Sequence, residues 1–207
     1  PLLDALADYF VEHHFDLRQL MRAIMTSRVY QLGSKAPASL AKEDRFYTHY
    51  NVKRLPAEVM LDAVNTVTGT QDKFPGIPAG TRAIELPDPN YASYFLDTMG
   101  RPKRAQACEC ERQSAPNLAQ VLHLVNGDVV NRKLADGKGR LARWLADKQL
   151  DDAAIAEQLY LLAFSRLPTD AEVATCRQIV ESAPNRREGW QDVMWAVLNS
   201  REFLFNH

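Results

Sequence analysis

Apolar positions in the first part of the chain recur every three to four residues, as they do in amphipathic helices. A first helix is predicted by an apolar face that consists of Leu2, Leu3, Leu6 and Phe10. A second helix begins after Asp16, whose carboxylate suits an N-cap, and its apolar side chains are Leu17, Leu20, Met21, Ile24 and Met25. A third follows Pro56, which suits a first helical turn, and ends at Gly69.

The last part of the chain shows the same periodicity. Ser114 or Asn117 can cap a helix over residues 118–125, and Gly127 would end it. Further helices are predicted around Leu141, Trp144 and Leu145, after Asp151 or Asp152, after Thr169, and along Trp190, Val193, Met194, Val197 and Leu198. We expect the apolar faces from both ends of the chain to bury a common interior.

The middle of the chain interrupts this pattern. Six of the eleven prolines lie between residues 70 and 116, and proline breaks regular helix. Two short strands are predicted, at 81–86 and 94–96, so this insert is irregular or forms a small β-hairpin. The predicted fold is therefore mainly α, a helical bundle-like single domain over residues 1–207 with an insert at about 70–116.

Composition and charge narrow the function classes only a little. Hydrophobic residues make up 46% of the chain and charged residues 25%, which is ordinary for a globular domain. The formal net charge of −1 argues against nucleic acid as the main partner. No apolar run reaches the roughly 20 residues of a membrane span. Because the chain begins at Pro1 in what reads as a helix, we expect it to be a piece of a larger protein.

The most unusual segment is the one from Ala107 to Arg112, ACECER. If it is extended, Cys108, Cys110 and Arg112 share one face. Three interpretations stay open: a redox pair of thiols activated by nearby arginines, a metal site that adds His123 to the two thiolates, or a structural turn with a strained disulfide or buried thiols. The sequence has no Cys-x-x-Cys-His for haem attachment and no Cys-x-x-Cys pair for zinc.

Other candidate groups have structural interpretations that we favour. Cys176 lies at helical spacing between Val173 and Val180, so we expect a buried, inert thiol. Arginines recur near the breaks between helices, where they are expected to tie helix ends and the insert together. The alternative is that one of them binds an anionic sugar or a carboxylate through a bidentate contact.

Several strings, in this order, resemble those of one known family. They are LMRAIMTSRVY (20–30), RLPAE (54–58), GTRA (80–83), GRP (100–102), ACECER (107–112), LHLVNG (122–127), RLPT (166–169) and AVLNSREFLFNH (196–207). This set resembles the planctomycete-specific C-terminal domain of unknown function, which ends large secreted proteins. Those proteins often carry an upstream c-type cytochrome domain, so the resemblance implies haem c only in that upstream domain.

The resemblance also implies an extracytoplasmic location, partners among the other domains of the parent protein, and a link to redox or polysaccharide handling. It supplies no reaction. The best-matching strings nominate one candidate site, whose residues are Arg82, Cys108, Cys110, Arg112, His123 and Asn126. Two hypotheses follow: a binding or scaffolding module that docks partner domains or a polysaccharide, or a redox or metal-dependent enzyme domain that uses the Cys108–Arg112 segment.

Overall fold

The computed structural model of the chain describes residues 1–35, 47–105 and 128–206. It confirms a mainly α fold with a small two-stranded sheet. The chain divides into two compact units, Pro1–Lys53 and Arg54–Asn206, and each is described by itself below. The expectation of one domain over residues 1–207 stays a prediction.

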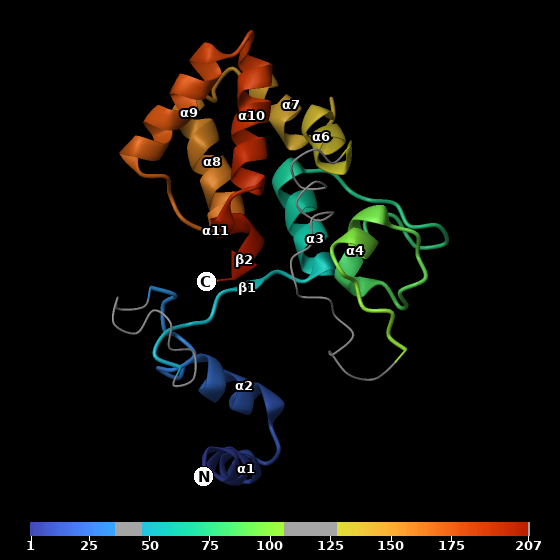
Figure 1. Cartoon of the computed structure of the whole chain (residues 1–207), viewed down its shortest axis with the longest axis vertical. Coiled ribbons are helices and arrows are strands. Elements are labelled where there is room, and N and C mark those ends of the chain that lie inside the picture. Colours follow the sequence, from blue (N-terminus) through green and yellow to red (C-terminus); the bar gives the residue numbers. More distant parts are fainter. Residues whose placement is uncertain (36–46, 106–127, 207) are drawn as a thin grey trace. The chain divides into compact units, whose positions relative to one another are not determined.

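The N-terminal unit contains helices α1 (Leu2–Glu12) and α2 (Leu17–Met25) (Figure 1). The predicted N-cap is confirmed, since the Asp16 carboxylate accepts hydrogen bonds from the backbone N–H groups of Arg18 and Gln19. The predicted burial is wrong: in these two fully described helices no residue is buried. Leu2 and Leu3 are 75% and 79% exposed, so helical periodicity here does not produce a buried face within the N-terminal unit.

Helix α3 (Ala57–Thr68) forms the centre of the second unit. It begins after Pro56 and ends at Gly69, as the sequence predicts; Gly69 has a φ of +66°, in the left-handed region that favours glycine. The helix is amphipathic. Its buried side includes Met60, Leu61, Val64 and Val67, whereas Asp62, Asn65 and Thr66 lie on its more exposed side.

The insert after α3 is helical where it is regular, within residues 70–105. It contains the 3-10 turn η2 (Ala83–Glu85) and the short helix α4 (Tyr94–Thr98), so the two strands predicted at 81–86 and 94–96 are wrong. Apolar runs this short do not distinguish a strand from a helical turn. Phe95, Leu96 and Met99 of this segment are buried against Met60 and Leu61 of α3, which gives the insert a core of its own.

The remaining helices build the main core. Their bounds are α6 (Asp128–Ala135), α7 (Arg140–Ala146), α8 (Asp152–Phe164), α9 (Asp170–Ser182), α10 (Arg186–Leu198) and α11 (Arg201–Leu204). The predicted caps are confirmed: Asp151 accepts from Ala154 N–H, and Thr169 forms a capping box with Glu172.

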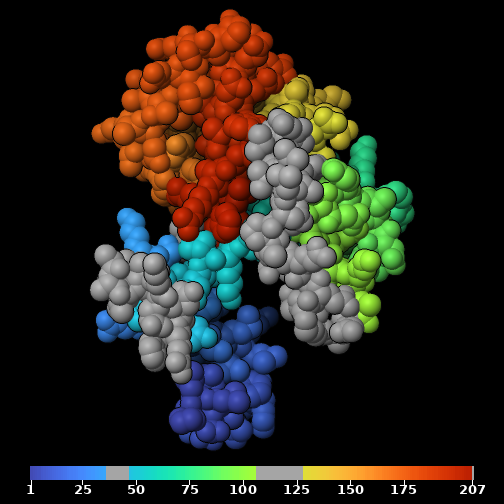
Figure 2. Space-filling model, in the orientation of Figure 1, coloured from blue at the N-terminus to red at the C-terminus, as the bar shows by residue number. Residues whose placement is uncertain are grey.

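Helix α10 packs against α6 to α9 and α11. Its Trp190 and Met194 are fully buried, and the backbone of Gly189 lies so close to α9 that an added Cβ would be 2.6 Å from the Cα of Val180. The orange and red helices of Figure 2 accordingly form one closely packed body.

The chain ends in a strand. β2 (Phe205–Asn206) pairs with β1 (Lys53–Arg54) in the two-stranded sheet, and next to it Leu55 N–H donates to the Leu204 carbonyl at 3.0 Å. Within the described ranges, no helix combines the length and apolar character of a membrane span.

Candidate functional site

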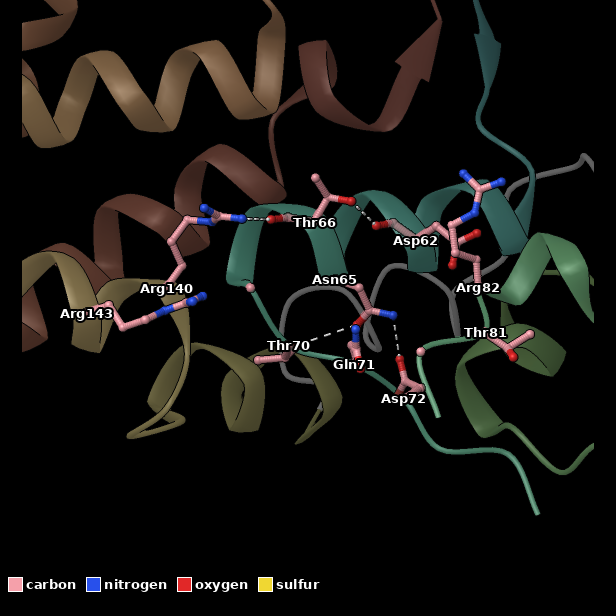
Figure 3. Close-up of a pocket in the computed structure, with 12 residues that line it drawn as sticks. Asp62, Asn65, Thr66, Thr70, Gln71, Asp72, Thr81, Arg82, Arg140 and Arg143 are labelled. Carbon is pink, nitrogen blue, oxygen red and sulfur yellow. Dashed lines mark hydrogen bonds between the residues drawn. The ribbon is translucent and has the colours of Figure 1, made fainter. Parts of the chain in front are cut away.

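An open pocket of about 500 Å³ lies along the exposed side of α3, entirely within the Arg54–Asn206 unit (Figure 3). Its walls come from α3, the segment that follows α3, the loop before η2, and α7. Five charged side chains line it: Asp62, Asp72, Arg82, Arg140 and Arg143. The net charge that a ligand would meet in this pocket depends on which of the five groups already form ion pairs or hydrogen bonds within the protein.

Asp62 is used to hold the loop before η2. One carboxylate oxygen accepts from Ala83 N–H at 2.7 Å, and the other accepts from Ile84 N–H at 3.1 Å. These bonds satisfy the free backbone donors at the start of the 3-10 turn. They also fix residues 80–82 as the wall of the pocket next to the first half of α3.

The charge of Asp72 is neutralised by an ion pair with the buried Lys133. Lys133 of α6 is only 9% exposed and donates to Asp72 at 2.9 Å and to Asn65 at 2.7 Å, with a longer bond to Thr70 at 3.4 Å. A buried ammonium needs such partners, because leaving it unpaired costs several kcal/mol, on the order of 3–5. The network therefore holds the pocket floor in place and removes Asp72 as a free carboxylate.

Arg140 covers the C-terminal end of α3. Its Nε donates to the Val67 carbonyl at 3.1 Å and its Nη2 to the Thr66 carbonyl at 3.0 Å. These carbonyls are among the acceptors that a helix leaves unsatisfied at its end, where the helix dipole also favours a cation. Burial, and to a smaller extent the positive charge of Arg143, lower the pKa of the Arg140 guanidinium.

Arg143 lies one turn further along α7, on the same face as Arg140. Its guanidinium is directly over the end of α3, since a Cβ added to Gly69 would be 2.6 Å from its Nη2. Within residues 1–35, 47–105 and 128–206, the Arg143 side chain makes no hydrogen bond or ion pair. The pocket thus contains two neighbouring guanidinium groups that no described carboxylate neutralises.

Hydrogen-bonding groups make up the rest of the described lining. They are the side chains of Asn65, Thr66, Thr70, Gln71 and Thr81, with Gly69 and Gly80. Among the described lining residues there is no aromatic or aliphatic side chain. Such a surface is suited to a ligand that carries hydroxyl groups and a negative charge, because guanidinium groups bind carboxylates and sulfates with paired N–H donors.

Of the predicted site residues, Arg82 is placed at this pocket. Arg82 is exposed, and its Nε contacts Glu85 at 3.3 Å. The hydrogen bond from the Arg82 backbone N–H lowers the pKa of the Glu85 carboxyl, and the positive charge of the Arg82 guanidinium lowers it further. The other five, Cys108, Cys110, Arg112, His123 and Asn126, lie outside the described residues. The same holds for the helix predicted at 118–125. The metal candidates Cys108, Cys110 and His123 therefore stay predictions.

Several arginines have the structural role that the sequence predicts. Arg54 donates to the Met99 carbonyl at 3.1 Å, and Arg104 donates to the Leu86 and Pro87 carbonyls at 3.3 and 3.2 Å. Arg101 donates to the Tyr91 carbonyl and pairs with Asp97. These contacts confirm that arginines tie the insert together.

The strongest ion-pair cluster of the described structure lies elsewhere and is also structural. Arg166 donates to both Glu172 and Glu202 at 2.7–2.9 Å, and these bonds lower the pKa of Glu172 to about 2. Cys176 is buried and free, as predicted, and burial raises the pKa of its thiol. Burial also raises the pKa of the neighbouring Tyr160 to about 12.

The residues that the sequence did not nominate are those of α3 and α7. Their signal was present: Asp62, Asn65 and Thr66 recur at helical spacing on the polar side of α3, and Arg140 and Arg143 are three residues apart. What the sequence could not supply is the approach of α7 to the end of α3, because about seventy residues separate them.

Among the described residues, no three histidine, cysteine, aspartate or glutamate side chains come together as a metal site would require. No curated protein and no solved structure matches the chain. A family match covers most of it: residues 1–180 match PSD1, described as a protein of unknown function, DUF1553. The chain therefore belongs to the PSD1 family of proteins of unknown function (DUF1553).

Proposed function

We propose that the Arg54–Asn206 unit is a non-catalytic binding module for an acidic saccharide, and that it works outside the cytoplasm as part of a larger protein. The observation that carries this proposal is the Arg140–Arg143 pair, which faces an open pocket with no carboxylate partner among the described residues. An anionic ligand group would offset the repulsion between the two guanidinium groups.

The remaining charges of the pocket favour the same ligand charge. Asp62 is engaged by two backbone N–H groups, and Asp72 is paired with buried Lys133. Among the described contacts, neither carboxylate forms an ion pair with Arg140 or Arg143. The dipole at the end of α3 compensates only part of the positive charge, about half an elementary charge.

A saccharide fits the lining better than a nucleic acid does. Single-stranded nucleic acids bind through aromatic side chains on which bases stack, and the described lining has none. Hydroxyl and amide groups such as those of Thr70, Gln71 and Thr81 can exchange hydrogen bonds with sugar hydroxyls.

The alternative of a redox or metal-dependent enzyme depends on the Cys108–Arg112 segment, which lies outside the described residues. It stays a prediction, and so does the association with a cytochrome domain. Metal analysis and thiol titration of the native protein test it directly. A bound metal or a reactive thiol of low pKa would favour the enzyme over the binding module.

The proposal is tested by isothermal titration calorimetry with oligogalacturonate, a carboxylated sugar oligomer, and with neutral dextran of similar size. We expect binding of the first only, and a loss of at least about tenfold in affinity for Arg143→Met, because a bidentate charged contact contributes about 1.5–3 kcal/mol. Arg177→Met is the matched control, because Arg177 is an exposed helical arginine away from the pocket.

Circular dichroism verifies that both variants keep the helical content of the parent chain. Equal affinity of Arg143→Met and the parent would refute the role of the arginine pair. Equal binding of dextran would refute the requirement for charge. A dextran sulfate arm distinguishes carboxylate from sulfate recognition, and binding of the sulfated polymer alone would reassign the anionic group.

A further inference from the structure

The two ends of the pocket differ in charge. Arg140 and Arg143 lie at the C-terminal end of α3, whereas Asp62 lies nearer the middle of the helix, with Arg82 beside it (Figure 3). From Asp62 to Gly69 the chain advances seven residues, which corresponds to about 10 Å at roughly 1.5 Å per helical residue. Salt screens much of the attraction between charges over such a distance, so each end presents its own charge to a ligand.

The end of the pocket near Asp62 keeps a net negative charge. The backbone N–H groups of Ala83 and Ile84 donate to the Asp62 carboxylate, but these donors are neutral and leave its charge in place. The nearby guanidinium of Arg82 already contacts Glu85 at 3.3 Å. This end thus contains two carboxylates and one guanidinium, and it would repel a second anionic group of a ligand.

The interval between the two ends is polar and carries little net charge. Lys133 balances the charge of Asp72, and Figure 3 shows Thr70 and Gln71 next to that carboxylate, beneath α3. The Gln71 amide faces the loop on the other side, since its atoms would be 3.8 and 3.9 Å from a Cβ at Gly80. Hydroxyl and amide groups both donate and accept hydrogen bonds, so the interval is suited to a neutral sugar.

We propose that the pocket selects an acidic saccharide in which the charged sugar is followed by a neutral one. The anionic group binds at Arg140 and Arg143, and the neutral neighbour lies along Thr70 and Gln71 toward Asp62. The inference rests on the proposed function and narrows its ligand, because consecutive uronic acids would place a second carboxylate near the Asp62 carboxylate. Two like charges about 4 Å apart in water repel each other enough to lower affinity about fivefold.

Calorimetry with two matched disaccharides tests this selection. They are digalacturonate and galacturonosyl-galactose, in which a hydroxymethyl group replaces the second carboxylate. We expect the parent chain to bind galacturonosyl-galactose about fivefold more tightly, and the difference to shrink when sodium chloride is added, because salt screens the repulsion.

Three variants assign the effect to one carboxylate. Asp62→Asn should remove the difference between the two disaccharides, because the amide carries no charge. Asp192→Asn should keep it; this matched control removes the charge of an exposed aspartate of α10 that does not line the pocket. Arg143→Met should weaken the binding of both disaccharides alike.

The outcomes separate this inference from the proposed function. If the parent chain binds both disaccharides equally or prefers digalacturonate, or if Asp62→Asn keeps the difference, selection by Asp62 is wrong while acidic saccharide binding stands. If neither disaccharide binds the parent chain, both are wrong. Because Asp62 also holds the loop before η2, circular dichroism verifies the fold of its variant, and the comparison on the parent chain decides the inference even if that variant unfolds.

Discussion

Replacement of Arg166 by methionine removes a guanidinium that two carboxylates share. Arg166 donates two hydrogen bonds to Glu172 and two to Glu202, all between 2.7 and 2.9 Å, and lies 5.4 Å from the ring centroids of Tyr160 and Phe164. These bonds connect the loop before α9 to α9 and to α11. Methionine keeps much of the aliphatic volume but leaves the two carboxylates facing each other.

The size of the expected loss of stability follows from how exposed the three charged side chains are. The three charged side chains are 30–37% exposed, so each bidentate pair contributes more than a surface pair and less than a buried one, about 1 kcal/mol. The cation–π contacts add about 0.5–1 kcal/mol. We expect Arg166→Met to lower the free energy of unfolding by about 2–3 kcal/mol at neutral pH.

Urea unfolding followed by tryptophan fluorescence measures this loss in the relevant unit, because all three tryptophans, Trp144, Trp190 and Trp195, lie in it. Arg177→Met is the control and should stay within about 0.5 kcal/mol of the parent, as surface substitutions do. A loss for Arg166→Met no larger than that of the control would refute the reasoning.

The pH dependence of the stability difference between the parent chain and Arg166→Met gives a second check. Hydrogen bonds from Arg166 hold the pKa of Glu172 at about 2 in the folded chain, below its ordinary value of 4.5. A carboxyl with a lowered pKa stabilises the fold fully above its unfolded pKa, and this contribution is lost as the pH falls through the folded pKa. The difference between parent and Arg166→Met should therefore shrink between pH 4.5 and 2; a difference that grows in this window contradicts the assignment.

Three further predictions concern packing, capping and the buried thiol. Gly189→Ala should destabilise the second unit by about 1–3 kcal/mol in urea unfolding, because the new Cβ meets the Val180 backbone at 2.6 Å, and a rise in stability from better helix propensity would show that the helices separate freely. Thr169→Ala should cost about 1 kcal/mol through the lost cap of α9, and an unchanged urea midpoint would contradict it. In a Cys108→Ser, Cys110→Ser background, Cys176 should resist a thiol reagent at pH 8 until urea unfolds the chain, since burial shields it and raises its pKa; rapid native labelling would overturn this.

Local features of the helices were predictable because they depend on residues close together in sequence. Asp16, Asp151 and Thr169 cap the helices that the periodicity predicts, and Gly69 ends α3. Each effect depends on one side chain and the next few backbone groups. Burial of Cys176 follows from the same helical spacing.

The errors arose where the local signal was short or where burial depended on distant partners. Residues 94–96 contain three large side chains that suit a strand, but packing of Phe95 and Leu96 against α3 selects a helical turn. The apolar faces of α1 and α2 satisfy the helical period, yet periodicity does not state what a face packs against. A correct helical spacing is therefore compatible with the exposure of Leu2 and Leu3.

The sequence alone determined the fold class, the central helix between Pro56 and Gly69, and Arg82 as a residue of interest. Only the tertiary structure decided that Arg82 shares a pocket with Arg140 and Arg143. Their proximity requires α7 to pack across the end of α3, and that packing depends on contacts between residues about seventy positions apart. A pattern read over a few turns of helix contains no information at that distance, because the free energy that closes such a loop comes from the whole buried core.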